Sequence, residues 1–428
     1  MAYTTSSNLL TAMQTNNANI APYVKVGIVT AEAGDTTIVT YDSDDRVLFL
    51  NTAEEPWEGA GEVWLDNQDN GLASYNYQGR RIHIHFGYQY GAGNEIVQRP
   101  DMWILNQRFH TEKGLSYLIL YLVDIWYIMS LNRSGGEADD KAAPAWNYAA
   151  EGYVHTIEEI VTQVLATVKP SGYASGISLT TQSGNLDVDG LGSPNIYSSG
   201  VFKEYEPFVI TDWNTSIRKI LRDVLNMTEV RLRAGQGGSG AGTNMQAYWM
   251  KTTEAADWTI ESSGTSNVLW IQRDMEDPLV IPNKVIYADL IASAEDGGVG
   301  GKESSVSAVA TNAASIARIG TLGTSVYVPQ SGTENTMGDN GTISAANEVQ
   351  LRANMIMFNF ELETLQGQLR MRPHLGFQLL DMVQVNDALY GTGGFKARVG
   401  RIEMVFDQRS GRQDDVFGGY YATIEFGL

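Results

Sequence analysis

Apolar residues at every second position constrain this chain more than any other feature of its sequence. The segment 81–86 alternates in this way, and so does the end of the chain. A period of two is the repeat of a strand with one buried face, so the chain is predicted to be mainly β. The residues that share a face in the two segments are Ile82, Ile84 and Phe86, and Ala422, Ile424, Phe426 and Leu428.

A third alternating segment, 395–406, changes phase in its middle. Its inward positions shift by one residue across Gly400. An extra residue on one strand produces such a shift, so the sequence predicts a β-bulge at this glycine. The inward positions are Phe395, Ala397 and Val399 before the shift, and Ile402, Met404 and Phe406 after it.

Three other segments carry the 3.6-residue period of an amphipathic helix. The first begins at Thr156, where Glu159 has the spacing of a capping box, and Pro170 ends it. The second covers 217–225, and the third follows Ser344. Each helix is expected to lie against a sheet. The inner face of the third is predicted to hold Val349, Ala353, Ile356 and Met357.

The order of these patterns divides the 428 residues into an arm, a β domain, an α/β insertion and a second β domain. The arm is predicted at 1–22, the first β domain at 23–130, the insertion at 131–275 and the second β domain at 276–428. The second β domain is expected to carry a long loop at 293–343, because both ends of that range are rich in Gly, Ser and Asn.

The charge of the chain argues against binding to nucleic acids or to anionic membranes. There are 50 Asp and Glu residues against 29 Lys and Arg, which gives a net charge of −21. An acidic surface repels nucleic-acid phosphates and anionic membranes, and it lacks the basic stripe of a DNA reader. The same repulsion would let DNA pass an acidic channel without sticking. Cysteine is absent, which excludes disulfides, thiolate metal sites and cysteine nucleophiles.

One stretch, 115–131, is apolar enough to be tested as a membrane span. It is only just long enough, and it holds Asp124 near its centre. A carboxylate at the middle of a bilayer costs about 2.5–3.5 kcal/mol. We therefore expect a buried strand that runs into a buried helical turn, and no membrane-spanning segment. Residues 1–8 lack a basic n-region, so no secretory signal is expected.

Two glycine-rich loops have the outline of nucleotide-binding motifs. The segment 235–240 matches G-x-G-x-x-G, but the residues after it are strand-like rather than helical, so a hairpin loop is predicted. The segment around Lys302 does not match a phosphate-binding loop. Asp296 stands where the first glycine belongs, and Glu303 stands where Ser or Thr would hold magnesium.

Metal sites are weighed at three places. His83 and His85 share one face of a strand, but zinc or iron needs a third ligand and none is nearby in sequence, so a plain strand face is favoured. The turn 66–71 resembles half of a calcium loop, but Tyr77 stands where the bidentate glutamate belongs. The segment 187–190 also lacks the bidentate glutamate of a calcium loop. Both segments are therefore predicted to be turns without a bound ion.

Adjacent carboxylates are the candidates for hydrolysis. Such neighbours are normally solvated, while the two carboxylates of a glycosidase come from separate elements about 5–10 Å apart. No nucleophile elbow or H-E-x-x-H motif is found. The prediction is a protein that is not an enzyme, with no catalytic, cofactor-binding or metal-binding residues. The adjacent pairs are Glu54 and Glu55, Asp139 and Asp140, and Asp414 and Asp415.

Several short segments resemble motifs of one protein family, in a consistent order along the chain. Residues 63–71 are similar to a strand that ends in an acidic-Gly turn, and 282–288 resemble an Asn-x-Val strand. Residues 312–320 resemble a Ser-Ile-x-x-Tyr-Gly turn, with Ile319 in place of the usual tyrosine, and 379–385 resemble a Gly-Asp-x-Val-x-Val strand. The family is the tail hub proteins of phages and contractile injection systems, which includes the late control protein D and baseplate hub families.

The resemblance implies a fold and an assembly. The segments 23–130 and 276–428 would each form a small antiparallel β-barrel of the tail-hub type, with the α+β region inserted between them. A homotrimer would then present six barrels in a pseudo-sixfold ring. That ring would match a hexameric tail tube on one side and a trimeric tip on the other.

The implied function is that of a structural tail hub at the distal tip of a bacteriophage tail, forming part of the DNA-delivery channel. DNA would pass through the lumen without specific binding. The implied partners are the tail tube or distal tail protein, the tape measure protein and a tip spike or fibre protein, and no cofactor is implied. The implied location is the tail tip of the virion, after assembly in the host cytoplasm.

Two other classes stay open. A cell-wall hydrolase associated with the tail tip would need a pocket with two converging carboxylates or a His–carboxylate metal site. Another viral shell or surface-layer protein would share the glycine-rich loops and the acidic β domains.

Overall fold

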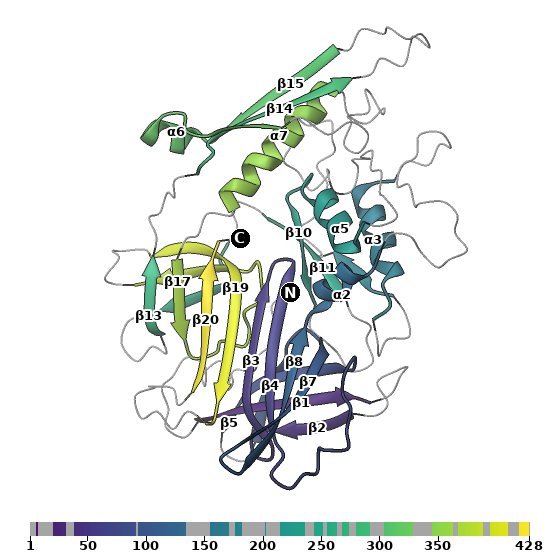
Figure 1. Ribbon diagram of the computed structural model, residues 1–428. Helices are drawn as coiled ribbons and strands as arrows, with labels where there is room; N and C mark the ends of the chain where they lie inside the picture. Colours follow the sequence, from purple (N-terminus) through teal and green to yellow (C-terminus); the bar gives the residue numbers. More distant parts are fainter. Residues whose placement is uncertain are drawn as a thin grey trace, which may run out of the picture.

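The computed structural model (Figure 1) describes most of the chain and both β domains. The described residues are 6, 20–30, 38–90, 93–133, 155–170, 176–181, 202, 215–235, 244–250, 255–262, 268–273, 280–291, 304–327, 345–362, 367–387, 394–409 and 419–427.

The first β domain is built from antiparallel strands that follow one another along the chain. Its hydrogen-bonded order is β3-β4-β8-β7-β5-β1-β2, and β6 pairs with β5. The alternation predicted for β5 is confirmed, because Ile82, Ile84 and Phe86 are buried in the core. The strands are β1 (Ile20–Val29), β2 (Ile38–Asp42), β3 (Val47–Glu55), β4 (Glu58–Asp66), β5 (Arg81–Tyr90), β6 (Gly93–Gln98), β7 (Met102–Glu112) and β8 (Leu115–Val123).

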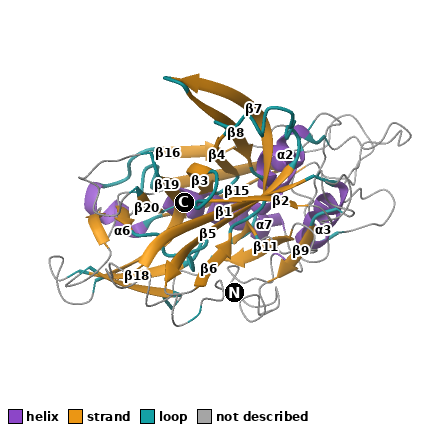
Figure 2. Cartoon of the chain, turned by 90° about the horizontal axis from the view of Figure 1, so that it is seen from below, coloured by secondary structure: helices purple, strands orange, loops and turns teal. Residues whose placement is uncertain are grey.

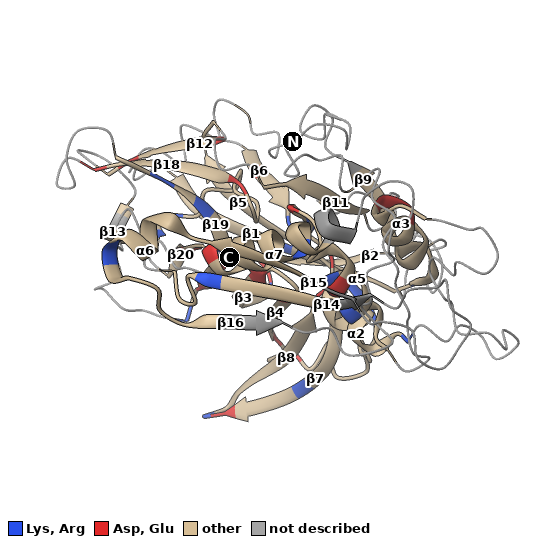
Figure 3. Cartoon of the chain, turned by 90° about the horizontal axis from the view of Figure 1, so that it is seen from above, with Lys and Arg blue, Asp and Glu red and all other residues tan. Residues whose placement is uncertain are grey.

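Strands β7 and β8 extend beyond the rest of the molecule as a long hairpin (Figures 2 and 3). β8 runs directly into helix α2 (Ile125–Leu131), and Asp124 caps that helix by accepting a hydrogen bond from the Tyr127 amide. The expected strand followed by a helical turn is therefore confirmed for 115–131. Among the described residues, no helix is long and apolar enough to cross a membrane.

The inserted region holds two further helices, α3 (Ile157–Thr167) and α5 (Ile217–Leu225), beside a small sheet. The capping box of Thr156 and Glu159 is formed at the start of α3. The sheet has the order β10-β11-β9, with β9 (Ser178–Thr181) parallel to β11 (Asn244–Trp249). β10 (Val230–Ala234) is antiparallel to β11, so a hairpin flanks the glycine-rich 235–240 segment, as predicted.

The second β domain is also antiparallel, except that β12 runs parallel to β18. It includes two strands from the range 131–275 predicted as the insertion, because β12 and β13 pair with β18 and β17. Its strands pair in the order β13-β17-β20-β19, and β18 joins β12 to β19. The bulge predicted at Gly400 is confirmed by a register shift between Val399 and Arg401. The strands are β12 (Trp258–Glu261), β13 (Val268–Arg273), β17 (Gly367–Met371), β18 (Met382–Asn386), β19 (Phe395–Asp407) and β20 (Tyr420–Phe426).

The two β domains are joined edge to edge. β3 pairs with β19 from Phe49 opposite Asp407 to Glu54 opposite Ile402, which makes one 14-stranded sheet of the described strands. The same hydrophobic core runs through both domains. Neither set of strands closes into a hydrogen-bonded ring within the described residues, so the two barrels stay a prediction. The mainly β fold with an α/β insertion is confirmed.

Residues 304–327 differ from the loop predicted across 293–343. They form β15 (Ser304–Thr311), α6 (Ala313–Ile319) and β16 (Thr324–Tyr327). With β14 (Lys284–Ile291) these strands make a separate sheet, and α7 (Ala345–Leu362) packs against β14 and β15 (Figure 1).

Small side chains explain why this strand was missed. The buried face of β15 presents Ala308 and Ala310, which are only weakly apolar in a sequence pattern. Both belong to the cluster that contains Val349, Ala353 and Met357 of α7. The inner face predicted for α7 is therefore confirmed, and Ile356 packs at the edge of the same cluster.

All three parts of the chain meet at the loop 373–381, between β17 and β18. From the first β domain, Tyr88 Oη donates to Pro373 O at 2.8 Å and Arg99 Nη1 donates to Phe377 O at 2.8 Å. From the insertion, Arg233 Nη1 donates to Leu379 O at 2.8 Å. Buried carbonyls must be hydrogen-bonded, so this loop holds its shape only while the three parts stay together.

Arg233 also forms a buried ion pair with Asp381 in that loop. The Nη1–Oδ1 distance is 2.7 Å, and both side chains are almost completely enclosed. Asp381 further accepts hydrogen bonds from the Trp258 indole at 3.1 Å and the Gln378 amide at 3.0 Å. The pair therefore ties the insertion to the second β domain.

Substituting Arg233→Met is expected to lower the free energy of unfolding by about 3–5 kcal/mol, because it leaves a buried carboxylate without its cation. Adding Asp381→Asn should restore part of the loss, since the amide keeps an oxygen for Trp258 and Gln378. Urea denaturation followed by tryptophan fluorescence measures both. The matched control is Arg46→Met, which breaks a two-pronged pair with the exposed Asp69 and should change stability little. Equal effects of the two substitutions would contradict this role of Arg233.

Candidate functional site

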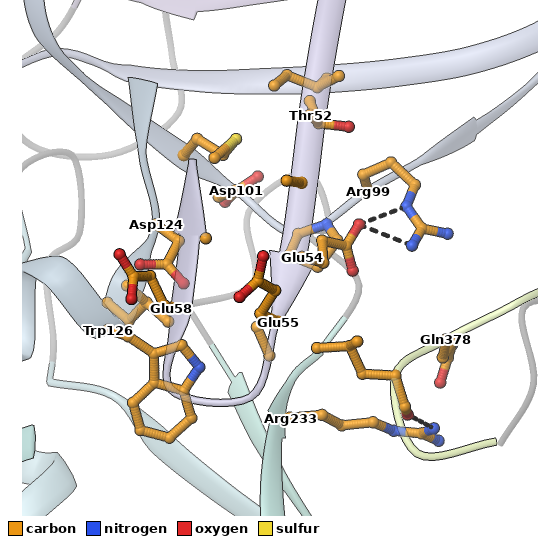
Figure 4. A pocket seen from close by; sticks show the side chains of 18 residues that line it. Thr52, Glu54, Glu55, Glu58, Arg99, Asp101, Asp124, Trp126, Arg233 and Gln378 are labelled. Atoms are coloured by element: carbon orange, nitrogen blue, oxygen red, sulfur yellow. Dashed lines mark hydrogen bonds and ion pairs between the residues drawn. The ribbon is translucent and has the colours of Figure 1, made fainter. Parts of the chain in front are cut away.

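A small cavity lies where the end of β3, the start of β4, the segment 99–102, α2, β10 and the 373–381 loop come together (Figure 4). Its volume is about 30 Å³, which is room for about one water molecule. Ligand sites usually measure about 300–1,000 Å³. The cavity is therefore too small to hold a substrate. The carboxylates in its wall are Glu54, Glu55, Glu58, Asp101 and Asp124.

Three of these carboxylates are engaged by arginine or histidine side chains. Arg99 binds Glu54 with Nε at 2.8 Å and Nη2 at 2.7 Å. Arg401 Nε lies 2.7 Å from Glu55, and His83 Nδ1 lies 2.7 Å from Asp101. The two neighbours Glu54 and Glu55 thus bind different arginines, on β-domain elements far apart in sequence. This adjacent pair is part of the packing between the β domains.

Asp124 differs from its neighbours, because burial raises the pKa of its carboxyl to about 7. The Tyr127 and Trp126 amides act in the opposite direction, as does the charge of Arg218. Gly59 lies directly against this carboxylate, since a Cβ built there would fall 2.8 Å from Asp124 Oδ2. A carboxyl group that titrates near neutral pH can exchange protons, but this one caps α2 beside a water-sized cavity.

The histidines considered for metal binding have structural partners. His83 sits in a buried network with Asp101, and Gln98 Nε2 lies 2.8 Å from its Nδ1. Burial lowers the pKa of His85 to about 4. Within the part of the chain that the structure describes, no group of three or more His, Asp or Glu side chains is placed to hold a metal ion.

The turn 66–71 is held by its own side chains. Asp69 accepts two hydrogen bonds from Arg46, at 3.0 and 2.6 Å, and one from the Gly71 amide at 2.9 Å. The Arg46 guanidinium keeps the pKa of Asp69 well below its usual range. Tyr77, at the position of the missing calcium ligand, is buried in the core. These observations agree with a turn.

Several sequence candidates lie outside the described residues. They are the acidic turn 187–190, the pairs Asp139 and Asp140 and Asp414 and Asp415, and the segment from Asp296 to Glu303. The grouping of carboxylates around the cavity could not be predicted from the sequence. One local signal was present, because Asp124 stands immediately before the helical segment in an N-cap position.

No family model matches the sequence, and no curated protein matches it. Solved structures do. The chain is similar to the tail protein from Neisseria meningitidis MC58, with a TM-score of 0.57 and 10% identity over 95% of this chain and 97% of that chain. It is also similar to the 43 kDa tail protein of prophage MuSo2 from Shewanella oneidensis, with a TM-score of 0.54 and 13% identity over 95% of this chain and 98% of that chain. The chain has the fold of phage tail proteins.

A chain of the lidded PdpA–VgrG complex from Francisella gives a TM-score of 0.50 with 10% identity. The match covers 96% of this chain but only 53% of that longer one. The two tail proteins, by contrast, are matched over almost their whole length. The phage tail fold therefore accounts for both β domains and the insertion together.

Several large apolar side chains are exposed. Leu105, Phe109 and Leu115 lie on the long β7–β8 hairpin. From Leu105 to Glu112, one edge of β7 has no strand partner within the described residues, because β5 reaches only Trp103 and Met102. Open edges and exposed apolar side chains are features of surfaces that contact other chains.

Asp124→Asn is expected to remove a pH dependence of stability. The folded pKa of about 7 lies above the ordinary 3.8, so the protonated form favours folding. That contribution is complete below about pH 4 and is lost as pH rises through 7, at up to about 1.4 kcal/mol per pKa unit. Asparagine keeps an oxygen for the Tyr127 amide. The free energy of unfolding of the variant, relative to that of the wild type, should therefore increase between pH 4 and 8.

Urea midpoints measured at several pH values test this expectation. Glu229→Gln is the companion variant, because burial also raises the pKa of Glu229 to about 7, and its carboxylate accepts a hydrogen bond from the Trp249 indole. With both substitutions, the urea midpoint should depend still less on pH. Parallel profiles for the wild type and Asp124→Asn would show that this carboxyl does not titrate near neutrality.

Proposed function

We propose that this chain is a structural protein of a phage tail, and that it acts as the tail hub at the distal tip. The observation that carries the proposal is the joined pair of antiparallel β domains, in a fold that matches two tail proteins from end to end. In this proposal three copies form a ring of six β domains, which adapts a hexameric tail tube to a trimeric tip.

The chemistry of the cavity supports a structural role rather than an enzymatic one. Its space of about 30 Å³ leaves no room for a sugar or peptide substrate. Four of the five carboxylates in its wall are bound by arginines or a histidine or cap a helix; they are Glu54, Glu55, Asp101 and Asp124. This cavity therefore offers no catalytic site, and the protein is proposed to work through its surfaces.

The net charge of −21 supports the second part of the proposal, a channel that DNA passes without binding. Acidic groups around a lumen repel the phosphate backbone at every step of its passage. In the proposed assembly the tail tube or distal tail protein, the tape measure protein and a tip spike or fibre would be the neighbours. A positively charged lumen in an assembled ring would contradict this part.

The mass of the purified protein tests the assembly. The proposal expects particles of three times 46.9 kDa by light scattering, and rings with a central hole by negative-stain electron microscopy. A cell-wall hydrolase would instead be a monomer that clears peptidoglycan in a gel. A monomer at all concentrations, or a closed shell, would contradict the hub.

Association should also strengthen with salt. Each subunit carries −21, so three subunits repel one another at long range, and salt shortens that range to about 8 Å at 0.15 M. The trimer fraction at a fixed low protein concentration is therefore expected to rise from about 0.01 M to 0.3 M salt. Mass photometry measures it, and an uncharged crowder at the same osmolarity is the control. A trimer that falls apart with added salt would point to contacts made mainly by opposite charges.

A further inference from the structure

A larger cavity, with a volume of about 340 Å³, lies where the insertion meets both β domains. This volume falls in the range in which protein pockets enclose a ligand or a side chain of a partner. The wall of the larger cavity is formed by the β3–β4 turn, α5, β10, the end of α7, β19 and the end of β20. It is therefore open to a group from outside the chain and is shaped by all three parts.

The charged side chains of the larger cavity are divided between its two sides. Arg222 and Arg231 come from the insertion, on α5 and β10. Glu55 and Glu425 come from the β domains, where Arg401 Nε lies 2.7 Å from the first and Nη1 lies 2.8 Å from the second. Two carboxylates thus share one guanidinium on the β-domain side. The insertion side is positive, and the β-domain side keeps a negative charge.

Arg222 is the part of the positive side that can still accept a partner. The residue is exposed, and no carboxylate of the described residues pairs with it. Arg231 Nη1, in contrast, donates to Leu225 O at 3.2 Å and to Thr228 O at 3.0 Å, and its Nη2 donates to Asn359 Oδ1. These named partners are neutral groups, so they do not cancel the charge of Arg231.

The tip of the β7–β8 hairpin carries two adjacent and opposite charges. Glu112 ends β7 and Lys113 follows it, with side chains that are 60% and 87% exposed. The hairpin extends beyond the rest of the molecule, and charges of both signs are seen at its tip (Figure 3). Glu112 lies 3.6 Å from Lys113 and 3.7 Å from His110. Exposed pairs of this kind contribute little, so both charges can be offered to another chain.

The backbone at the tip is unusual for a lysine. Glu112 and Leu115 are directly paired, so Lys113 and Gly114 are the two turn residues, with φ of 53° and 84°. Such a turn favours Asn or Gly, because L side chains rarely adopt positive φ. Residues held in sparsely populated backbone conformations cluster at places where a side chain has a function. A contact made by the lysine charge would account for its presence here.

We infer that the tip of the β7–β8 hairpin of one copy inserts into the larger cavity of the next copy. The Glu112 carboxylate then faces Arg222, and Lys113 faces the two carboxylates of the β-domain side. A closed ring of three copies requires contacts of this type, in which two different surfaces of each chain meet head to tail. The inference rests on the proposed assembly of copies, and it adds which two surfaces meet.

A small ion is the competing occupant of the larger cavity. An anion bound near Arg222 would face Glu55 and Glu425 across the same space, and a cation would face the arginines of the insertion. Adjacent charges of opposite sign satisfy both sides at once. Pairs enclosed in a cavity are also screened by salt less than exposed charges are. The contact therefore agrees with an assembly that strengthens as salt weakens the long-range repulsion between subunits.

Cross-linking tests the contact directly, because the chain contains no cysteine. Lys113→Cys and Asn226→Cys, the second in the cavity wall, are purified separately, mixed and treated with a short bis-maleimide. A covalent dimer should form in the mixture and in neither variant alone. Leu322→Cys, an exposed position outside the cavity wall, replaces Asn226→Cys as the control and should give no dimer with Lys113→Cys.

Charge reversal is the second test, read as the trimer fraction by mass photometry. Arg222→Glu should raise the concentration of half-association about tenfold, and adding Glu112→Lys should restore part of the loss. Lys219→Glu is the matched control, because it makes the same charge change at an exposed position of α5 outside the cavity wall. Lys113→Asn should also weaken association, while its melting temperature stays equal or rises because asparagine suits the turn.

The outcomes separate this inference from the proposed assembly. A wild type that forms trimers, with mixed cysteine variants that do not cross-link, would overturn the inference and leave the hub standing. Equal association of Arg222→Glu and Lys219→Glu would overturn it in the same way. Cross-linking of Lys113→Cys to itself would show that two hairpins pair with each other instead. A wild type that stays monomeric at all concentrations would overturn both.

Discussion

Buried arginines that donate to the backbone of the 373–381 loop are the contacts on which the rest of the structure depends. Arg99 comes from the first β domain and Arg233 from the insertion, while Arg398 of the second β domain donates to Leu380 O at 2.7 Å. Each guanidinium supplies several donors in a fixed plane, so it can satisfy a loop carbonyl and a carboxylate at once. The loop in turn would be costly to bury without them. The three parts of the chain are therefore stabilised as one body rather than as separate domains.

The same pairing of charges extends to the carboxylates around the cavity. Arg99 pairs with Glu54, Arg81 lies 3.5 Å from Asp101, and Arg233 pairs with Asp381. The cavity beside Glu54 and Asp101 holds about one water. The surface carries the excess negative charge, the exposed apolar side chains of the β7–β8 hairpin, and the edge of β7 that has no strand partner among the described residues. A rigid body with distinct surfaces is what an assembly protein requires, because its contacts must hold a fixed geometry toward several neighbours.

Local patterns in the sequence predicted much of the fold. The capping box at Thr156, the bulge at Gly400 and the buried face of α7 each depend on residues a few positions apart, and each is confirmed. The strand β15 was missed because its buried positions are alanines, which carry little periodic signal. The candidate site could be predicted only in part, because the position of a carboxylate in the sequence does not show which arginine it will pair with.

What the sequence determined by itself was the type of most elements, because periodicity, caps and turn residues act within one element. What only the tertiary structure decided was how those elements meet. Asn51 and Val405 face each other across β3 and β19, and Arg99 finds its carbonyl 278 residues further along the chain. Such contacts depend on which buried groups remain unsatisfied once the elements pack, and that is a property of the whole folded chain rather than of any segment.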